Sequence, residues 1–216
     1  MKTVTHDLHT HSDFSDGVST VEEIVAQAQR VGLKTVAITD HFWPSLGSKM
    51  GAESLVEERS RVLSALRDEQ RGLRILGGAE VDIETNGSLC PVAGGLEQFD
   101  IVIGSVHAPC RSEVWVSALC KVVRSNHIDI LAHWDGYLTS YRMEDGERAA
   151  RALSDAGVAV ELSARYPTRD EGFLVLARDA GCEFALGSDS HSATTVGRLQ
   201  DQLRLAEALA LPLLDR

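Results

Sequence analysis

The sequence predicts an α/β fold of parallel strands. A pattern recurs along the chain, at 29–41, 69–80, 154–164 and 178–189: an amphipathic stretch, a glycine, a short apolar run and a polar cluster. A glycine placed just after a helix can take the left-handed conformation that ends it, so each unit predicts a helix, a stop and a strand. The apolar runs are continuous rather than alternating, which is typical of parallel strands covered on both faces.

The first helix is the clearest element. Its apolar residues share one face at helical spacing, and they are Val21, Ile24, Val25, Ala28 and Val31. Just before them, Ser19 or Thr20 can cap the helix together with Glu22 or Glu23, which is the composition of a capping box. We therefore expect a helix that begins next to these residues.

The remaining elements follow the same rhythm. We expect further helices near 53–70, 112–125, 144–156, 171–180 and 198–210. We expect strands near 3–8, 34–39, 73–80, 101–106, 129–133, 158–162 and 183–187. Strands that alternate with helices favour a parallel sheet. Only 81–100 breaks the rhythm, and its Asn-Gly pair predicts a short hairpin or excursion. No linker divides the chain, so we expect a single domain over residues 1–216.

Composition narrows the classes of function. The chain has 216 residues, with 21 Lys+Arg against 32 Asp+Glu and a net charge of −11. This acidity disfavours binding of long nucleic acid, but it leaves room for a small anionic substrate held by metal ions. No apolar run approaches the roughly 20 residues of a membrane span. The four cysteines lack metal-type or redox-type spacing, which indicates free thiols in a reducing compartment. We expect a cytoplasmic protein that does not bind membranes. The sequence carries no signal for its oligomeric state.

The histidines are the strongest functional signal. Six of the eight follow a predicted strand, and they are His9, His11, His41, His107, His133 and His191. Acidic residues stand at equivalent points: Asp16, Asp40, Glu80 and Asp189. In a parallel barrel the carboxyl ends of all strands meet at one face, so these side chains converge. Imidazole and carboxylate without cysteine suit zinc, manganese or iron. The sequence therefore predicts a metal site.

These residues fall into motifs that resemble those of the PHP (polymerase and histidinol phosphatase) superfamily. The motifs run along nearly the whole chain: HxHxxxxD at 9–16, TDH at 39–41, GGAE at 77–80, GSVH at 104–107, LAH at 131–133 and GSDSH at 187–191. The resemblance implies a distorted (βα)7 TIM-like barrel. It also implies two or three divalent ions (Zn, Mn or Fe) at the carboxyl ends of the strands.

The resemblance further implies a ligand set for each ion. The first set is His9, His11, Glu80 and Asp189. The second is Glu80, His107 and His133, so that Glu80 bridges two ions. The third is Asp16, His41 and His191. No ligand position of the family is missing from this chain.

Such a site permits hydrolysis of phosphate esters. Two divalent ions about 3.5–4 Å apart can bridge a hydroxide and bind phosphate oxygens. We expect hydrolysis of small phosphate monoesters, possible histidinol phosphatase activity included, with Asp189 orienting that hydroxide and His191 as a candidate proton donor. Arg165 and Arg111 are expected to clamp the phosphate. Glu161 is expected to be a buried barrel residue, and Asp40 either fixes an imidazole or caps a loop.

Three other functions compete with this one. The same metals could cleave phosphodiesters, which makes a nuclease acting on nucleotides or short oligonucleotides the main alternative. A metal-dependent amidohydrolase is disfavoured, because those enzymes commonly place a lysine at a strand end and this chain places none there. A non-catalytic metal-binding module is disfavoured because the ligand set is complete.

Overall fold

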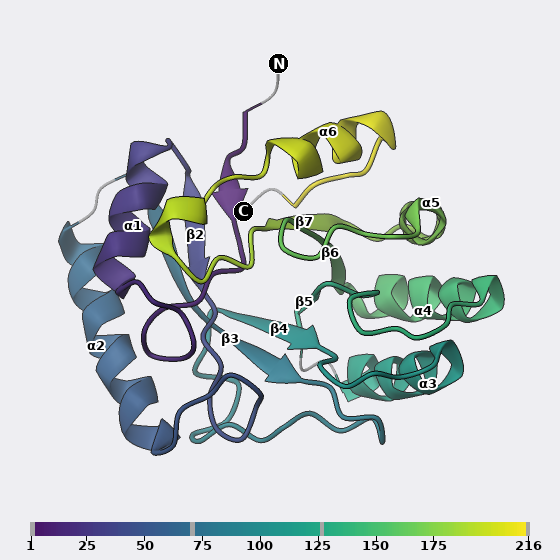
Figure 1. Cartoon of the computed structure of the whole chain (residues 1–216), viewed down its shortest axis with the longest axis horizontal. Helices are drawn as coiled ribbons and strands as arrows, with labels where there is room; N and C mark the ends of the chain where they lie inside the picture. The colour runs from purple at the N-terminus through teal and green to yellow at the C-terminus, as the bar shows by residue number, and fades with distance from the viewer. Residues whose placement is uncertain (1–2, 70–71, 126–127, 215–216) are drawn as a thin grey trace.

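Seven parallel strands form a nearly closed barrel in the computed structural model, which describes residues 3–69, 72–125 and 128–214 (Figure 1). The strands are β1 (His6–Asp7), β2 (Thr35–Ile38), β3 (Arg74–Asp82), β4 (Ile101–Ser105), β5 (Ile130–Leu131), β6 (Ala159–Ser163) and β7 (Phe184–Gly187). They neighbour one another in chain order. The two ends of this sheet also meet, since Leu8 N–H donates to the carbonyl of Leu186 at 2.9 Å.

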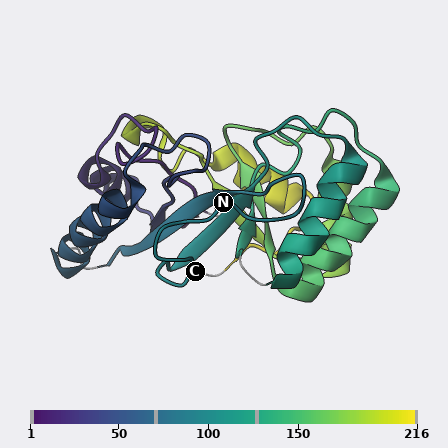
Figure 2. The ribbon, with the colours of Figure 1, turned by 90° about the horizontal axis from the view of Figure 1, so that it is seen from below.

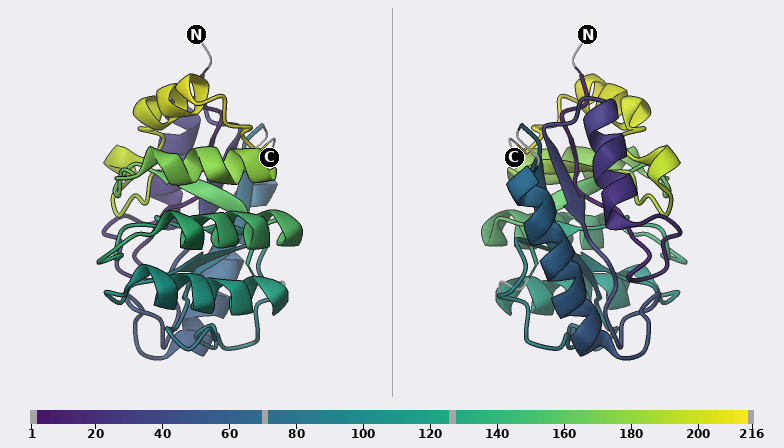
Figure 3. Two further views of the ribbon diagram at one scale, coloured as in Figure 1. Left: turned by 90° about the vertical axis from the view of Figure 1, so that its right-hand side faces the viewer. Right: turned by 90° about the vertical axis from the view of Figure 1, so that its left-hand side faces the viewer.

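Six helices cover the outside of the described barrel. They are α1 (Val21–Arg30), α2 (Ala52–Glu69), α3 (Ser112–Val122), α4 (Met143–Ala156), α5 (Glu171–Ala180) and α6 (Gln200–Ala208). Short 3-10 turns occupy Val123–Ser125 and Ala193–Thr195. Figure 2 shows α1 and α2 on one side of the strands and the teal-to-green helices α3 to α5 on the other. Figure 3 shows α3, α4 and α5 stacked side by side.

The interior of the barrel is filled by apolar side chains from around the sheet. This cluster consists of Leu8, Ala37, Leu76, Ile101, Ile103, Ile130, Ala132, Ala159 and Ala185. Two further apolar clusters lie outside the barrel, one under α1 and α2 and one under α3 to α5. The inner cluster fills the barrel below the carboxyl ends of the strands.

Strand β3 changes partner halfway along. Arg74 to Gly77 pair with β2, and Gly78 to Asp82 pair with β4. Gly78 stands at the change, where a Cβ would lie 2.6 Å from Cγ2 of Ile101 and 2.8 Å from its carbonyl oxygen. Only glycine allows the strands to approach this closely. The change of partner leaves the second half of β3, which carries Glu80, between β4 and the segment that follows β2.

The sequence predictions of the fold are confirmed, with differences at the ends of strands. The predicted strands near 3–8 and 129–133 shorten to two residues each, His6–Asp7 and Ile130–Leu131. Beyond Asp7 the regular pairing with β2 ends: Leu8 and His11 donate to the β7 side, while Thr10 accepts from the N–H of Thr39 just after β2. Thr20 and Glu23 form the predicted capping box. The 81–100 excursion turns back through an antiparallel bridge between Ile83 and Leu89.

Other expectations about the chain stand as follows. The four cysteines are free thiols: Cys90, Cys110, Cys120 and Cys182. Within the described ranges, none of the helices combines the length and the apolar character that crossing a membrane requires. The single domain over residues 1–216 stays a prediction.

The four glycines of the recurring pattern all adopt positive φ. Gly32, Gly72, Gly157 and Gly181 have φ of 79°, 95°, 68° and 99°.

A Cβ on Gly157 would meet nothing within 4 Å, so substitution there tests the backbone conformation alone. We expect Gly157→Ala to lower the free energy of unfolding by about 1–2 kcal/mol, because L-residues disfavour this region. Urea unfolding measures it. Gly157→Asn should recover part of the loss, since asparagine tolerates the left-handed conformation, and equal stability of Gly157→Ala and the parent would contradict the prediction.

Candidate metal centre

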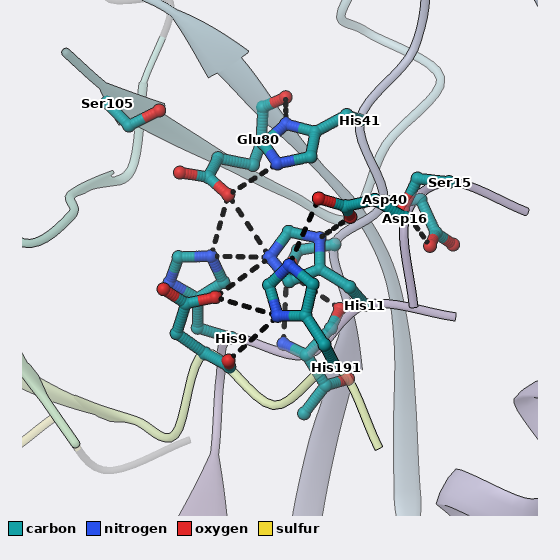
Figure 4. Close-up of polar contacts among 12 residues, drawn as sticks. His9, His11, Ser15, Asp16, Asp40, His41, Glu80, Ser105 and His191 are labelled. Atoms are coloured by element: carbon teal, nitrogen blue, oxygen red, sulfur yellow. Dashed lines mark hydrogen bonds and ion pairs between the residues drawn. The ribbon is translucent and has the colours of Figure 1, made fainter. Parts of the chain in front are cut away.

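The carboxylate of Glu80 lies at the centre of a cluster of imidazoles. It is 1% exposed and projects from the second half of β3. Its Oε2 lies 2.8 Å from Nε2 of His9, 3.2 Å from Nε2 of His11 and 3.3 Å from Nε2 of His41. Its Oε1 lies 3.0 Å from Nε2 of His133 and 3.4 Å from Nε2 of His107. Figure 4 shows the rings of His9, His11 and His41 turned toward this carboxylate.

These five histidines follow the carboxyl ends of four strands. His9 and His11 follow β1, His41 follows β2, His107 follows β4 and His133 follows β5. Asp189 and His191 follow β7 and complete the ring on the side of β1. The structure thus brings together the side chains that the sequence placed after the strands; their role as metal ligands stays a prediction.

The three implied ligand sets can be compared with these distances. In the first, Nε2 of His9 and Nε2 of His11 are 3.0 Å apart, and Oδ1 of Asp189 is 3.4 Å from Nε2 of His11. In the second, His107 and His133 both reach Oε1 of Glu80. In the third, Oδ2 of Asp16 lies 3.1 Å from Nε2 of His191. His41 lies close to two sets, since it groups with Asp16 and His11 as well as with Glu80 and His107.

Electrostatics in the cluster favour a bound cation. Burial opposes ionisation of Glu80, but His9 and His41 outweigh it and hold the pKa of Glu80 well below its usual range. Burial likewise opposes protonation of His11, while Asp189 and Glu80 raise the pKa of His11 to about 9. The buried carboxylates therefore demand positive charge next to them. A divalent ion supplies that charge and displaces protons from the ring nitrogens.

The donor set also fits divalent metals. Five imidazoles and three carboxylates form overlapping groups of possible ligands, and none of these donors is a thiolate. A sixth imidazole, that of His133, joins them through its Nε2, which lies 3.0 Å from Oε1 of Glu80. Nδ1 of His11 and Nδ1 of His133 are buried without a hydrogen-bond partner in the described structure. Such a set suits zinc, manganese or iron. The residues present therefore fit the metal ions that the sequence predicts.

A buried ion pair holds two of the ligand-bearing loops together. Arg59 of α2 is 2% exposed and donates to Oδ2 of Asp40 at 3.0 Å and to the carbonyl of Gly78 at 2.6 Å. Asp40 also accepts from the backbone N–H of Ser12 and the hydroxyl of Ser15, both at 2.7 Å. Of the two roles expected for Asp40, these contacts support the capping of the loop after β1.

Sequence reasoning missed three residues that support the cluster. Arg59 gave no signal, because it stands in the middle of an amphipathic helix. Asp82 accepts from Nδ1 of His107 at 2.7 Å, although it was not expected near the site. Glu161 is buried as expected, but its partners are His9 and His133 rather than unrelated barrel residues. Spacing from the strand ends would have pointed to Asp82, which is the last residue of β3.

The cluster opens into a hollow of about 310 Å³. Leu46, Tyr137, Arg165 and Tyr166 line it together with Glu80 and the surrounding donors. The guanidinium of Arg165 contacts Nδ1 of His191, and its Nε lies 4.0 Å from Oδ2 of Asp189. Arg165 therefore stands at the rim, as the sequence led us to expect.

Arg111 is placed differently. It precedes α3, its side chain is 70% exposed, and its Nε lies 3.1 Å from a carboxylate oxygen of Glu113. It is absent from the described lining of the hollow. Its guanidinium therefore pairs with the first turn of α3 in this structure.

Comparisons with known proteins agree with this geometry. The family model described as PHP domain matches residues 7–165. The "DNA polymerase/3'-5' exonuclease PolX" of Bacillus subtilis is 31% identical over 86% of this chain, which spans only 34% of that protein. The "Probable phosphatase YcdX" of Shigella flexneri is 30% identical over 96% of this chain and 86% of its own length.

Among solved structures, a histidinol phosphate phosphatase from Lactococcus lactis shares the fold. It superposes with a TM-score of 0.71 at 19% identity, and the match covers 99% of this chain and 96% of that one. That protein was crystallised with zinc, L-histidinol and phosphate.

The buried pair yields a prediction about stability. Arg59→Met removes the partner of Asp40 and leaves a buried carboxylate uncompensated, so we expect a loss of about 3–5 kcal/mol in the free energy of unfolding. Chemical denaturation measures it. Arg61→Met is the matched control, because the side chain of Arg61 is 73% exposed on the same helix. The double variant Arg59→Met, Asp40→Asn should lose less than Arg59→Met alone; a single variant as stable as the control would refute the argument.

Proposed function

This chain belongs to the PHP-domain family, and from that premise we propose that it is a metal-dependent phosphatase that hydrolyses phosphate monoesters of small molecules. The observation that carries the proposal is the carboxylate of Glu80, buried among five imidazole nitrogens at the floor of an open hollow. Candidate ligands for more than one ion meet there at a single carboxylate.

The residues that would hold the ions are those of the three implied sets: His9, His11, Asp16, His41, Glu80, His107, His133, Asp189 and His191. Divalent ions bound there would neutralise the charge of a phosphate and lower the pKa of a water molecule for attack on phosphorus. Phosphoryl transfer needs little covalent help beyond such positioning and charge neutralisation.

Asp189 is placed to orient the attacking water. Its side chain is 5% exposed and lines the hollow, and its Oδ1 lies 3.4 Å from both His11 Nε2 and His191 Nδ1. Asp189 itself has φ of 51°, a conformation that only close support maintains. A carboxylate fixed in this way can accept a proton from water at the floor of the hollow.

His191 is placed to deliver a proton to the leaving group. Its Nδ1 contacts the guanidinium of Arg165 and lies 3.1 Å from the backbone carbonyl of Asp189. Nε2 faces Oδ2 of Asp16 at 3.1 Å. A hydrogen on Nε2 would suit proton donation, whereas a ligand role for Nε2 requires that hydrogen to leave.

Arg165 is our candidate for binding the non-bridging phosphate oxygens. Its side chain is 45% exposed at the rim, close to Asp189 and His191. A guanidinium can hold two oxygens at once, which fixes the orientation of a phosphate over the ions. We leave Arg111 out of this role, because its side chain lies along α3 and pairs with Glu113.

The space beside the metal centre suits a small leaving group. A second hollow of about 610 Å³ shares Arg165, Asp189 and His191 with the first and is also lined by Val18 and Arg198. The Lactococcus lactis protein with this fold was solved with L-histidinol and phosphate, so histidinol phosphate is the first monoester to test.

Phosphodiester cleavage is the second candidate. The similarity to the Bacillus subtilis polymerase and exonuclease favours it. The net charge of −11 opposes binding of long nucleic acid and leaves nucleotides and short oligonucleotides as diester substrates.

A substrate panel separates the two. We expect protein reloaded with zinc, manganese or iron to release phosphate from monoesters, histidinol phosphate among them, far faster than from nucleoside diesters or oligonucleotides of matched concentration. Treatment with a chelator should abolish the release, and readdition of metal should restore it. A preference for diesters would overturn the monoester proposal in favour of nuclease activity, and inactivity at full metal loading would overturn both.

Arg165→Ala tests the phosphate clamp. We expect kcat/KM for the best monoester to fall about 10–100-fold, because a charge-assisted pair of hydrogen bonds contributes about 1.5–3 kcal/mol. Arg165→Lys should recover only part of the lost kcat/KM, since an ammonium cannot bind two phosphate oxygens through a planar pair of hydrogen bonds as a guanidinium does. Arg111→Ala serves as the matched control and should leave the kinetics unchanged. Unaltered kinetics in Arg165→Ala would remove this residue from the site.

A further inference from the structure

Glu161 connects two of the candidate ligand histidines from inside the barrel. It stands in the middle of β6 and is 3% exposed. Its Oε1 lies 2.7 Å from Nδ1 of His9, and its Oε2 accepts the backbone N–H of His133 at 2.8 Å. Both oxygens of one buried carboxylate are therefore used by residues that the candidate metal centre requires.

The first contact fixes the hydrogen of the His9 ring. An ionised carboxylate only accepts hydrogen bonds, so Nδ1 of His9 must be the donor. The atom left to bind an ion is Nε2, and this is the atom that faces Oε2 of Glu80 at 2.8 Å and Nε2 of His11 at 3.0 Å. Carboxylates that hold the far nitrogen of a ligand histidine commonly set its tautomer and orientation.

The second contact supports a strained backbone. His133 has φ of 26°, which is uncommon for a residue with a side chain. Its Nδ1 has no hydrogen-bond partner among the described residues, although the ring packs against that of Tyr166 with centroids 4.9 Å apart. The backbone of His133 therefore helps to aim the imidazole, whose Nε2 lies 3.0 Å from Oε1 of Glu80.

A glycine in the next strand makes room for this carboxylate. A Cβ on Gly187 of β7 would lie 1.9 Å from Oε1 of Glu161 and 2.8 Å from Cβ of His9. Gly187 is thus tied to Glu161 by close packing. Asp82 offers a contrast, because its hydrogen bond reaches the ring of His107 alone among the candidate ligands.

We propose that Glu161 is a positioning residue that holds the His9 ring and the His133 backbone ready to bind metal, and so couples the first and second ion positions. This inference rests on the proposed function only in assuming that the cluster binds metal. Glu161 does not touch the substrate; it acts through the two histidines.

Glu161→Gln tests the coupling sharply. A glutamine amide offers one acceptor and one donor, so whichever way it turns it loses either the His9 contact or the His133 contact. We expect affinity for the first and second zinc ions to fall about 10–100-fold, as measured by competition with a chromophoric chelator. Asp82→Asn should weaken the binding of one ion, and Glu183→Gln, the same chemical change at an exposed position before β7, should weaken none.

A spectroscopic measurement on the parent protein does not depend on any variant folding. In zinc-loaded, 15N-labelled protein, the ring hydrogen of His9 should reside on Nδ1, and Glu161→Gln should shift or broaden that signal. Gly187→Ala, which displaces the carboxylate without removing it, should weaken zinc binding in the same way. Zinc affinity of Glu161→Gln equal to that of the parent, or a His9 ring without hydrogen on Nδ1, would overturn the inference. Loss of zinc affinity in a protein that turns over no phosphate ester would sustain it and refute the proposed function instead.

Discussion

The structure depends on one buried carboxylate that five imidazoles share. Burying Glu80 in a barrel costs free energy, because an isolated carboxylate loses its hydration there. Its position follows from the change of partner in β3, which requires Gly78 where the backbone meets Ile101. Arg59 then donates to the carbonyl of that same glycine and to Asp40. These hydrogen bonds connect β3, α2 and the loop after β2 next to the point where the donors meet.

The barrel separates a closed lower half from a polar upper half. Below Glu80 the interior is apolar, and four of its nine buried residues are alanines. Such small side chains on β2, β6 and β7 and after β5 leave room for the carboxylates of Glu80 and Glu161 above them. The cluster opens at a mouth where Tyr137, Arg165 and Tyr166 stand. Charges that are buried above an apolar floor interact more strongly than they would in open water.

The sequence could predict the residues that occupy the same position after each strand. It could not predict the residues whose role depends on contacts between distant strands of the barrel. Histidines after strands converge because all strands are parallel, so their positions alone indicated a common face. Glu161 and Arg59 carry no such signal: Glu161 is one acid in the strand AVELS, and its partner His9 is 152 positions away. Arg111 shows the limit of nearness in sequence: it follows His107 by four positions, yet it stands at the start of α3 with its side chain exposed beside Glu113.

The same cross-barrel contacts explain how strained residues persist at the centre. His133 and Asp189 both have positive φ, and both follow strands that end at the site. The backbone N–H of each is held by another element. That of His133 donates to the side chain of Glu161 in β6, and that of Asp189 donates to the carbonyl of His9, just after β1, at 2.8 Å. Strain of this kind lasts only where the surroundings over-determine it. His9 takes part in both arrangements, through its ring on Glu161 and its carbonyl on Asp189. The contacts that close the barrel between β1 and β7 are therefore the same contacts that bring the donors together. A change that separated β1 from β7 would move the donors of the candidate metal centre apart even with every donor still present.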